Sequence, residues 1–305
     1  METIFLIGGS GFIGKNLVEY LSKHYHVTVV DKFIDDVFFK KHPQVDTVKI
    51  DLVGQRIPDE YETPDFIINL ASIVTAERDF SLFDGMIASN LKVLLNLYER
   101  FKDDSKLKLF IQFGSSEEYG SEGSPFVETM REKPSSPYAL VKQFTVNTAM
   151  MLYSNYGFPA MVVRPGNLFG KYQNVSKFIP YVISQLIKNE DLNVTPCEQK
   201  RDFISAAIFS KCIGLLLENY EKCLGQIVNV ASGESISLKE IIEISKNIVN
   251  SSSHINYGAK PYRQNEVMDL RCSIDKFEEI TNRNIYIDIK EEIKELSGYL
   301  KANLR

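Results

Sequence analysis

A tyrosine and a lysine at positions i and i+4 of the stretch SSPYALVK (135–142) are the residues of this chain best suited to chemistry. On a helix, Tyr138 and Lys142 lie on one face, and a lysine ammonium near a phenol favours the phenolate. A tyrosine alone is a poor base, because its ordinary pKa is about 10. The pair therefore indicates proton abstraction from a hydroxyl group, and the alternative is a solvated surface pair.

A serine upstream supplies a hydrogen-bonding partner for such a reaction. Ser115 lies in the stretch FGSSEEYG (113–120), at the end of an apolar run. Ligands of open α/β folds bind outside the carboxyl ends of the strands, so we expect Ser115 to lie near Tyr138. Pro137 pre-sets the backbone at the helix start and thereby fixes where Tyr138 points. Ser115 is then predicted to hydrogen-bond the reacting oxygen.

A glycine pattern near the amino terminus predicts the second reactant. Gly8, Gly11 and Gly14 follow the first apolar run and open the first expected helix. This spacing permits a tight turn, close approach to a pyrophosphate and close packing of helix on strand. The helix N-terminus adds N–H groups and a field that favours phosphate. We therefore predict a dinucleotide site, with ordinary turn glycines as the alternative.

Two aspartates and a lysine bear on the choice of dinucleotide. Asp31 ends the second apolar run, where a carboxylate accepts hydrogen bonds from the adenosine ribose and repels a 2′-phosphate. This favours NAD over NADP, although Lys32 beside it could tolerate a phosphate. Asp51 ends the third run and is predicted to reach the adenine, its alternative being a simple turn aspartate. With NAD bound, Tyr138 would take a proton while hydride passes to the nicotinamide, and Lys142 would hold the nicotinamide ribose.

Alternating apolar and amphipathic segments predict the elements that position these residues. The apolar runs are β-branched and nearly continuous, and they occupy 3–9, 26–32, 46–52, 65–72, 106–116 and 159–167. Helical patterns lie between them near 12–23, 83–103 and 138–155. This alternation is typical of an α/β fold with a doubly wound parallel sheet of the Rossmann type.

The second part of the chain is richer in helical patterns, apart from one strand-like run at 226–232. We expect the Rossmann domain to comprise 1–165 and about 226–234. The remaining segments, 166–225 and 235–305, would form a smaller α-rich substrate lobe.

The bulk composition argues against several classes of protein. The chain of 305 residues is 44% hydrophobic and 25% charged, with a net charge of −5 and no long basic run, which argues against nucleic acid as the main partner. No apolar run reaches membrane-spanning length, so we expect a cytoplasmic protein with no membrane partner. The 4 cysteines lack CxxC spacing and the 4 histidines join no acidic or thiol cluster, so we predict neither disulfides nor a metal site.

The expected helix at 138–155 is apolar on nearly all sides. Packing on a sheet needs one apolar stripe, so the extra face predicts contact with a second copy of the chain. The homodimer would use the helices at 83–103 and 138–155. The alternative is a helix buried within the monomer.

The ordered series of motifs resembles that of the extended short-chain dehydrogenases/reductases, and among them the NAD-dependent nucleotide-sugar epimerase/dehydratase family. The series spans almost the whole chain, with GGSGFIG (8–14), VVDK (29–32), DL (51–52), NLAS (69–72), Asn90, GSSEEYG (114–120), SSPYALVK (135–142), RPGNLFG (164–170), RDF (201–203) and YRQNEVM (262–268). The resemblance implies that Ser115, Tyr138 and Lys142 are the catalytic set, that NAD is the cofactor, and that the substrate is a nucleotide-diphosphate sugar.

The same resemblance implies the binding residues. Further cofactor contacts would be Phe12, Ile13, Leu52, Leu70, Ala71, Ser72 and Asn90. Substrate contacts would be Ser116, Asn167, Phe178, Arg201 and Arg263. Asn167 would contact the diphosphate, and the two arginines would bind phosphates or nucleotide, with Glu266 orienting Arg263. The alternatives are a surface salt bridge for either arginine and a core position for Phe178.

Three reactions of the family bear on sugar C4. A 4-epimerase returns hydride to the other face of the keto sugar, a 4,6-dehydratase expels water across C5 and C6, and a 4-ketoreductase runs only the reverse hydride step. Glu117 stands where similar dehydratases place the C5 base, but Ser116 replaces an aspartic acid that some of them carry. Glu118 is interpreted as a solvated neighbour.

The form of GSSEEYG also resembles epimerases and 4-ketoreductases of surface-polysaccharide pathways. We therefore expect NAD-dependent redox chemistry at C4 of a nucleotide hexose, by an epimerase or a reductase, with the dehydratase as the alternative. A non-catalytic dinucleotide sensor is a further alternative, against which the intact pair of Tyr138 and Lys142 argues.

Overall fold

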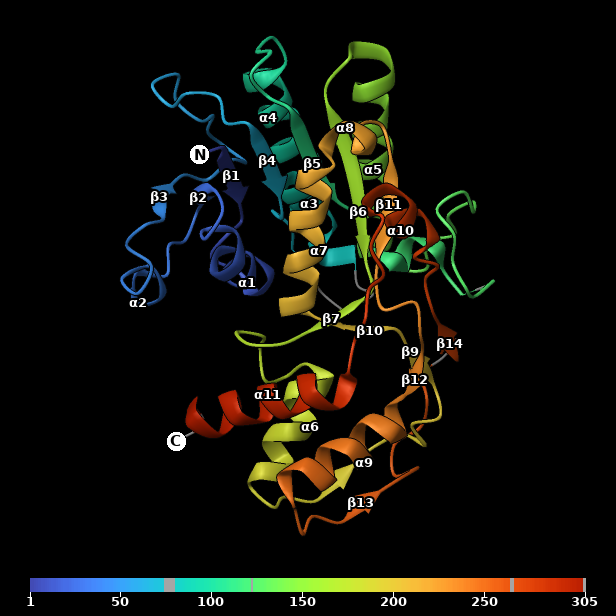
Figure 1. Ribbon diagram of the computed structural model, residues 1–305. Coiled ribbons are helices and arrows are strands. Elements are labelled where there is room, and N and C mark those ends of the chain that lie inside the picture. The colour runs from blue at the N-terminus through green and yellow to red at the C-terminus, as the bar shows by residue number, and fades with distance from the viewer. Residues whose placement is uncertain (74–79, 122, 264–265, 304–305) are drawn as a thin grey trace.

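The computed structural model describes residues 1–73, 80–121, 123–263 and 266–303. Within them, seven parallel strands form one sheet in the order β11-β6-β5-β4-β1-β2-β3 (Figure 1). The strands are β1 (Thr3–Ile7), β2 (His26–Asp31), β3 (Asp46–Lys49), β4 (Phe66–Asn69), β5 (Leu109–Phe113), β6 (Ala160–Pro165) and β11 (Ile227–Val230). The strand order reverses between β1 and β4, which confirms the predicted doubly wound sheet.

Both faces of the sheet are covered by helices, so its strands are mostly apolar on both faces. Ile4 and Leu6 of β1 belong to the core under one pair of helices, and Phe5 and Ile7 belong to the core under the other pair. The first pair is α1 (Phe12–Leu21) and α7 (Ala206–Glu218), and the second is α4 (Val93–Phe101) and α5 (Pro137–Tyr156). This alternation places apolar side chains under the helices on both faces of the sheet.

The predicted division of the chain needs a correction at two helices. We assigned α7 and α10 (Asp275–Thr281) to the substrate lobe, but α7 packs against α1 and α10 packs against β11. Phe209 and Ile213 of α7 share a buried cluster with Leu17 of α1. The apolar side of α7 thus covers sheet surface that α1 leaves open, and the chain returns to the Rossmann part more often than expected.

The helical lobe lies below the carboxyl ends of the strands in Figure 1. Its helices α6 (Phe178–Ile187), α9 (Leu238–Val249) and α11 (Ile289–Asn303) pack on one another around a separate apolar core. Short strands accompany them: β7 (Asn167–Phe169), β8 (Leu192–Asn193), β9 (Lys200–Arg201), β10 (Phe203–Ser205), β12 (Ile236–Ser237), β13 (Ile255–Asn256) and β14 (Asp269–Leu270). The lobe and the sheet therefore face each other across the strand ends.

The helix expected at 83–103 is interrupted. Its segments are α3 (Phe83–Ile87), the π-helical η2 (Ala88–Lys92) and α4, and the short η1 (Phe80–Leu82) precedes them. Short helices α2 (Asp36–Phe39) and α8 (Tyr220–Cys223) lie in other connections. A π turn inserts an extra residue, and this changes which side chains of the segment face the strand ends.

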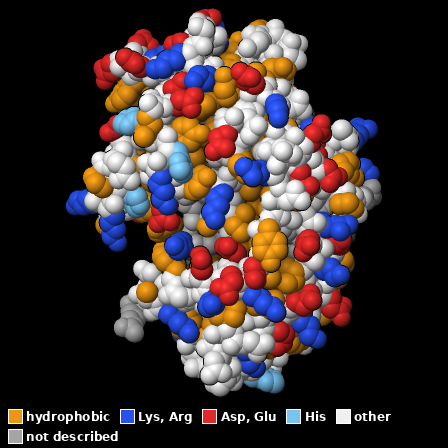
Figure 2. Space-filling view, in the orientation of Figure 1, with side chains coloured by type: hydrophobic (Ala, Val, Ile, Leu, Met, Phe, Trp, Pro, Cys, Tyr) orange, Lys and Arg blue, Asp and Glu red, His pale blue; other side chains and the backbone are white. Residues whose placement is uncertain are grey.

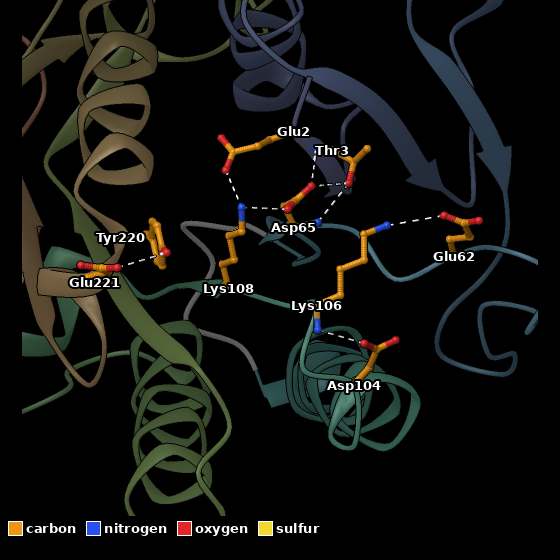
Figure 3. Close-up of polar contacts among 9 residues, drawn as sticks. All are labelled: Glu2, Thr3, Glu62, Asp65, Asp104, Lys106, Lys108, Tyr220 and Glu221. Atoms are coloured by element: carbon orange, nitrogen blue, oxygen red, sulfur yellow. Dashed lines mark hydrogen bonds and ion pairs between the residues drawn. The ribbon is translucent and has the colours of Figure 1, made fainter.

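A polar cluster ties together the amino ends of β1, β4 and β5 (Figure 3). Lys108 Nζ lies 2.7 Å from Glu2 Oε1 and 3.0 Å from Asp65 Oδ1. Asp65 Oδ2 accepts hydrogen bonds from the backbone N–H of Thr3 at 2.9 Å and from its hydroxyl at 3.0 Å. Burial raises the pKa of Asp65, but the hydrogen bonds from Thr3 and Lys108 and the charge of Lys108 together outweigh burial, so that the pKa is lowered. The amino ends are thus closed by their own side chains, and the carboxyl ends are left for a ligand.

Acidic and basic side chains are interspersed over the face of the molecule in Figure 2. In the part of the chain that the structure describes, no helix has the length and apolarity to cross a membrane. The same residues contain no group of three or more His, Cys, Asp and Glu side chains placed to hold a metal ion. All four cysteines are free thiols and buried.

Candidate active site

A cavity of about 660 Å³ runs across the carboxyl ends of the strands and faces the helical lobe. Most of the predicted site residues line it: Gly8, Gly11, Phe12, Ile13, Gly14, Asp31, Lys32, Asp51, Leu52, Leu70, Ala71, Ser72, Ser115, Ser116, Glu117, Tyr138, Asn167 and Phe178. A volume of this size suits a bound organic ligand. The residues predicted for the cofactor and those predicted for the chemistry therefore line one cavity.

The glycine turn brings the backbone of β1 and α1 close together. Gly8 has φ +75°, a left-handed conformation that glycine adopts without strain. A Cβ on Gly14 would lie 2.4 Å from the Cα of Gly9, so no larger residue fits there without movement. A Cβ on Gly11 would meet only the Gly8 carbonyl oxygen at 3.5 Å. Gly11 therefore borders open room at the N-terminus of α1, which is where a pyrophosphate would bind.

Asp31 and Asp51 hold their own loops and also line the cavity. Asp31 accepts the N–H of Ser10 at 3.0 Å and that of Phe33 at 3.2 Å, one on each carboxylate oxygen. Asp51 Oδ1 accepts the N–H of Val53 at 3.0 Å, as a turn aspartate does. An ionised carboxylate has about four lone-pair sites, so both groups keep acceptor capacity for ribose or base.

Three buried polar atoms that line the cavity lack a hydrogen-bond partner among the residues that the structure describes. They are Ser72 Oγ, Asn167 Nδ2 and Gln173 Oε1. Buried polar atoms are usually paired, so this arrangement fits a polar ligand that completes their hydrogen bonds. Together with the open room at Gly11, the donor and acceptor set fits a dinucleotide: the glycine turn and Asp31 would hold its adenosine diphosphate half.

The chemical residues come from two elements beside the sheet. Ser115 follows β5 and caps η3 (Ser116–Tyr119), where its Oγ accepts the N–H of Glu117 at 3.2 Å. Tyr138 lies in the first turn of α5, which Ser136 caps by accepting the N–H of Ala139 at 3.1 Å. These two caps aim Ser115 and Tyr138 at the same part of the cavity, where both line the wall.

Lys142 lies one turn further along α5, beneath the wall. Its Nζ is 5.9 Å from the ring centroid of Tyr138 and donates a hydrogen bond to the Phe113 carbonyl at 3.1 Å. Lys142 is 3% exposed and Tyr138 is 8% exposed, so the two residues do not form a solvated surface pair.

The expected acidic phenol is not a property of the protein by itself. Burial raises the pKa of Tyr138, the charge of Glu117 raises it further, and a side-chain hydrogen bond with Ser115 only partly offsets this. Burial likewise lowers the pKa of Lys142 to about 8. Desolvation therefore outweighs the attraction on which the prediction relied. The positive charge of an oxidised nicotinamide ring is the part of the predicted cause that remains.

The two glutamates after Ser116 have opposite environments. Glu117 is exposed on the cavity wall, with its Oε2 3.5 Å from Ser136 Oγ. Glu118, which we interpreted as solvated, is fully buried and pairs with Arg164 of β6 at 2.8 Å. Sequence reasoning overlooked Arg164, although a charged residue within an apolar strand run signals a buried partner.

Four predicted ligand residues do not line the cavity: Lys142, described above, and Arg201, Arg263 and Asn90. The Arg201 guanidinium pairs with Glu266 and donates to the Val267 carbonyl at 2.6 Å, so Glu266 orients Arg201 rather than Arg263. Arg263 is exposed elsewhere on the lobe. Asn90 is fully buried, and its Nδ2 donates to the Met86 carbonyl at 2.8 Å because the π turn directs it inward.

Several polar residues after β7 line the cavity and were not predicted. They are Gln173, Asn174 and Lys177, of which Lys177 precedes α6 and is exposed. The signal was a polar run, KYQNVSK, that follows a strand end. Lys177 brings a cation to the lobe side of the cavity, where an anionic ligand group would be favoured.

Comparison with known proteins decides the family. The sequence profile of the NAD dependent epimerase/dehydratase family matches residues 4–231. The chain belongs to this family. It is an NAD-dependent enzyme of the nucleotide-sugar epimerase/dehydratase type, within the extended short-chain dehydrogenases/reductases.

Full-length relatives of this family member have different activities. The putative UDP-glucose 4-epimerase of Methanocaldococcus jannaschii is 25% identical over 99% of each chain. The GDP-6-deoxy-D-mannose reductase of Pseudomonas aeruginosa is 24% identical over 100% of this chain and 99% of its own. The UDP-glucuronic acid 4-epimerase of Bacillus cereus, solved with UDP-glucuronic acid and NAD, superposes with a TM-score of 0.90 at 21% identity over 99% of each chain. At 21% identity, the similarity to this solved structure shows a shared fold.

Proposed function

We propose that this enzyme oxidises or reduces C4 of a nucleotide-activated hexose, as a 4-epimerase or a 4-ketoreductase. The observation that carries the proposal is the shared cavity, which Ser115, Tyr138 and the glycine turn all line. The full-length relatives named as an epimerase and a reductase support this class of substrate and reaction.

Each residue has a definite task in this proposal. Bound NAD supplies the hydride acceptor or donor. Tyr138 removes the proton of the C4 hydroxyl, or returns it in the reverse direction. Ser115 hydrogen-bonds the same oxygen. Lys142 binds the nicotinamide ribose and also holds the first turns of α5 in place. The diphosphate lies against Asn167 and Lys177 on the lobe side.

A 4,6-dehydratase is the second candidate, and one observation favours it. Glu117 lines the cavity beside Ser115, where a carboxylate could remove the C5 proton. The neighbouring position is Ser116, which also lines the cavity and has no carboxyl group to protonate a departing hydroxyl. The donor set is therefore more complete for redox chemistry at C4 alone.

The decisive experiment replaces the phenol hydroxyl. Tyr138→Phe should lower kcat by about 10²–10⁴-fold with UDP-, GDP-, CDP- or dTDP-hexoses, because it removes the acid–base group. NAD binding, measured by titration calorimetry, should stay within about twofold of the wild type. Tyr153→Phe, on the exposed side of the same helix, is the matched control and should retain activity. Equal, measurable kcat values for wild type and Tyr138→Phe would contradict the role proposed for Tyr138, and NAD binding without turnover in either protein would favour a sensor.

Isotope and cofactor measurements separate the three reactions. Tightly held NAD in the purified enzyme favours an epimerase or a dehydratase, while consumption of NADH with a 4-keto sugar identifies a reductase. In deuterated water, label at C5 of the product would assign the dehydratase and make Glu117 its base.

We also propose a homodimer through α4 and α5. Leu95 of α4 and Phe144 and Met151 of α5 are about two-fifths exposed on the side away from the sheet. Phe144 and Met151 are seven residues apart and so lie on one helix face. A second copy of the same helices would cover this apolar surface.

A further inference from the structure

A buried arginine joins the two segments that carry Ser115 and Tyr138. Arg164 on β6 is 0% exposed. Its Nε donates to Glu118 Oε2 at 2.9 Å, and its Nη2 lies 2.8 Å from the same oxygen. That Nη2 also lies 2.6 Å from Glu132 Oε1. Glu118 belongs to the turn after Ser115, and Glu132 belongs to the loop that leads into α5. One guanidinium therefore spans both segments.

The link continues directly to Ser115. Glu118 Oε1, the oxygen that does not face Arg164, accepts the backbone N–H of Ser115 at 2.6 Å. The close fit requires glycine at position 114, since a Cβ there would lie 2.5 Å from the same oxygen. The backbone N–H of Lys133 donates to the Glu118 carbonyl at 2.9 Å, beside the ion pairs. The Ser115 turn and the approach to α5 are thus fixed to one another.

Burying these charges is costly, and a well-packed apolar group in their place would often stabilise a protein as well or better. A guanidinium has a planar array of donors, and this array fixes the directions of both carboxylates. Proton transfer depends on placement within a fraction of an ångström, so a rigid link between two catalytic segments has a kinetic role.

We propose that Arg164 is a positioning residue, which pairs with Glu118 and Glu132 at once and so holds Ser115 and Tyr138 at the separation that proton transfer requires. The proposal rests on the function proposed above for Ser115 and Tyr138. It predicts that cutting the link to Glu132 reduces turnover and leaves ligand binding intact.

Glu132 is the place to cut this link. Arg164→Met would leave the Glu118 carboxylate buried without a charge partner, and loss of the fold would then hide any effect on positioning. The Glu132 side chain is 19% exposed and lies in a loop, so Glu132→Ala leaves a site that water can reach. Glu132→Gln keeps an oxygen acceptor for Arg164 and serves as the conservative rescue.

The same loop offers a matched control. Glu128 is also partly exposed, and its Oε1 accepts the backbone N–H of Asn229 in β11 at 2.8 Å. Glu128→Ala therefore removes one carboxylate anchor of the loop without touching Arg164. A general loosening of the loop would affect both alanine variants alike, and loss of the Arg164 link would affect Glu132→Ala alone.

The experiment measures kcat, KM, NAD affinity and amide hydrogen exchange for the wild type and these three variants. Glu132→Ala should lower kcat about tenfold or more while KM and the Kd for NAD change less than about twofold, and Glu132→Gln should restore most of kcat. Exchange should accelerate in peptides 113–120 and 134–142 for Glu132→Ala only. Wild-type kcat and protection in Glu132→Ala, or equal losses in Glu128→Ala, would overturn the proposal. If the wild type turns over no nucleotide sugar, the proposed function fails, and the exchange data alone decide on the link.

Discussion

At the scale of single residues, the burial of Lys142 in the site costs the folded protein stability. Among the described residues, its Nζ donates to a backbone carbonyl, at 3.1 Å, and to no carboxylate. Burial disfavours the ammonium and lowers its pKa from 10.5 to about 8, while the charge of Glu118 opposes this shift. The protonated form of Lys142 is thus less stable in this buried site, where the lysine would bind ribose hydroxyls, than it is in water.

This cost makes the stability of the NAD-free protein depend on pH. Between about pH 8 and 10.5 the unfolded chain binds the Lys142 proton more readily than the folded protein, so the free energy of unfolding rises with pH in this window. Lys142→Met removes the proton site. Urea unfolding should show that the free energy of wild type gains on that of Lys142→Met by about 2 kcal/mol from pH 7 to about pH 9.5. A difference that is constant with pH would contradict the assigned shift.

Residue types and spacing correctly predicted the cavity residues whose position is set by the backbone. Gly8, Gly14 and Asp31 belong to this class, because a turn and a strand end leave little freedom. The partners of long charged side chains could not be predicted. Glu118 pairs with Arg164 across strands, and Arg201 pairs with Glu266 across the lobe, so both depend on contacts far apart in the chain.

At the scale of elements, two glycines of the turn from β1 to α1 have different tasks: one is needed for folding and the other for ligand binding. A Cβ at position 14 would overlap the backbone of Gly9, but a Cβ at position 11 would enter open space along the cavity. The first contact belongs to helix–strand packing and the second to the cofactor cradle. The interrupted helix of α3, η2 and α4 was not predictable in the same way, since a π turn leaves no clear periodic signal.

The two glycines should therefore respond differently to alanine. Gly14→Ala should lower the free energy of unfolding by about 1–3 kcal/mol, because the helix must move away from the strand. Gly11→Ala should unfold at nearly the wild-type urea concentration and weaken NAD binding at least about tenfold, because its methyl group occupies the cradle. Gly54→Ala, whose Cβ would have no neighbour within 4 Å, is the control for both measurements. Unchanged NAD affinity in Gly11→Ala would place the pyrophosphate elsewhere.

At the scale of the whole molecule, the sheet could be predicted and the boundary of the lobe could not. Near-continuous apolar runs separated by helices leave few arrangements other than a parallel sheet covered on both faces. A helix such as α7 carries one apolar stripe, and that stripe fits the sheet or the lobe equally well. The position of α7 beside α1 depends on which part of the sheet surface the other helices leave uncovered, and this cannot be predicted from a local sequence pattern.

The apolar surface on α4 and α5 leads to the last prediction, which concerns assembly. Light scattering should give the wild type a mass of twice 34.8 kDa. Phe144→Glu places a charge in the centre of the proposed interface, where it would be desolvated by the second copy, so this variant should be monomeric at the same concentration. Tyr286→Glu, at an aromatic residue that is 83% exposed away from these helices, is the control and should remain dimeric. A monomeric wild type would leave the apolar face of α5 without the partner proposed for it.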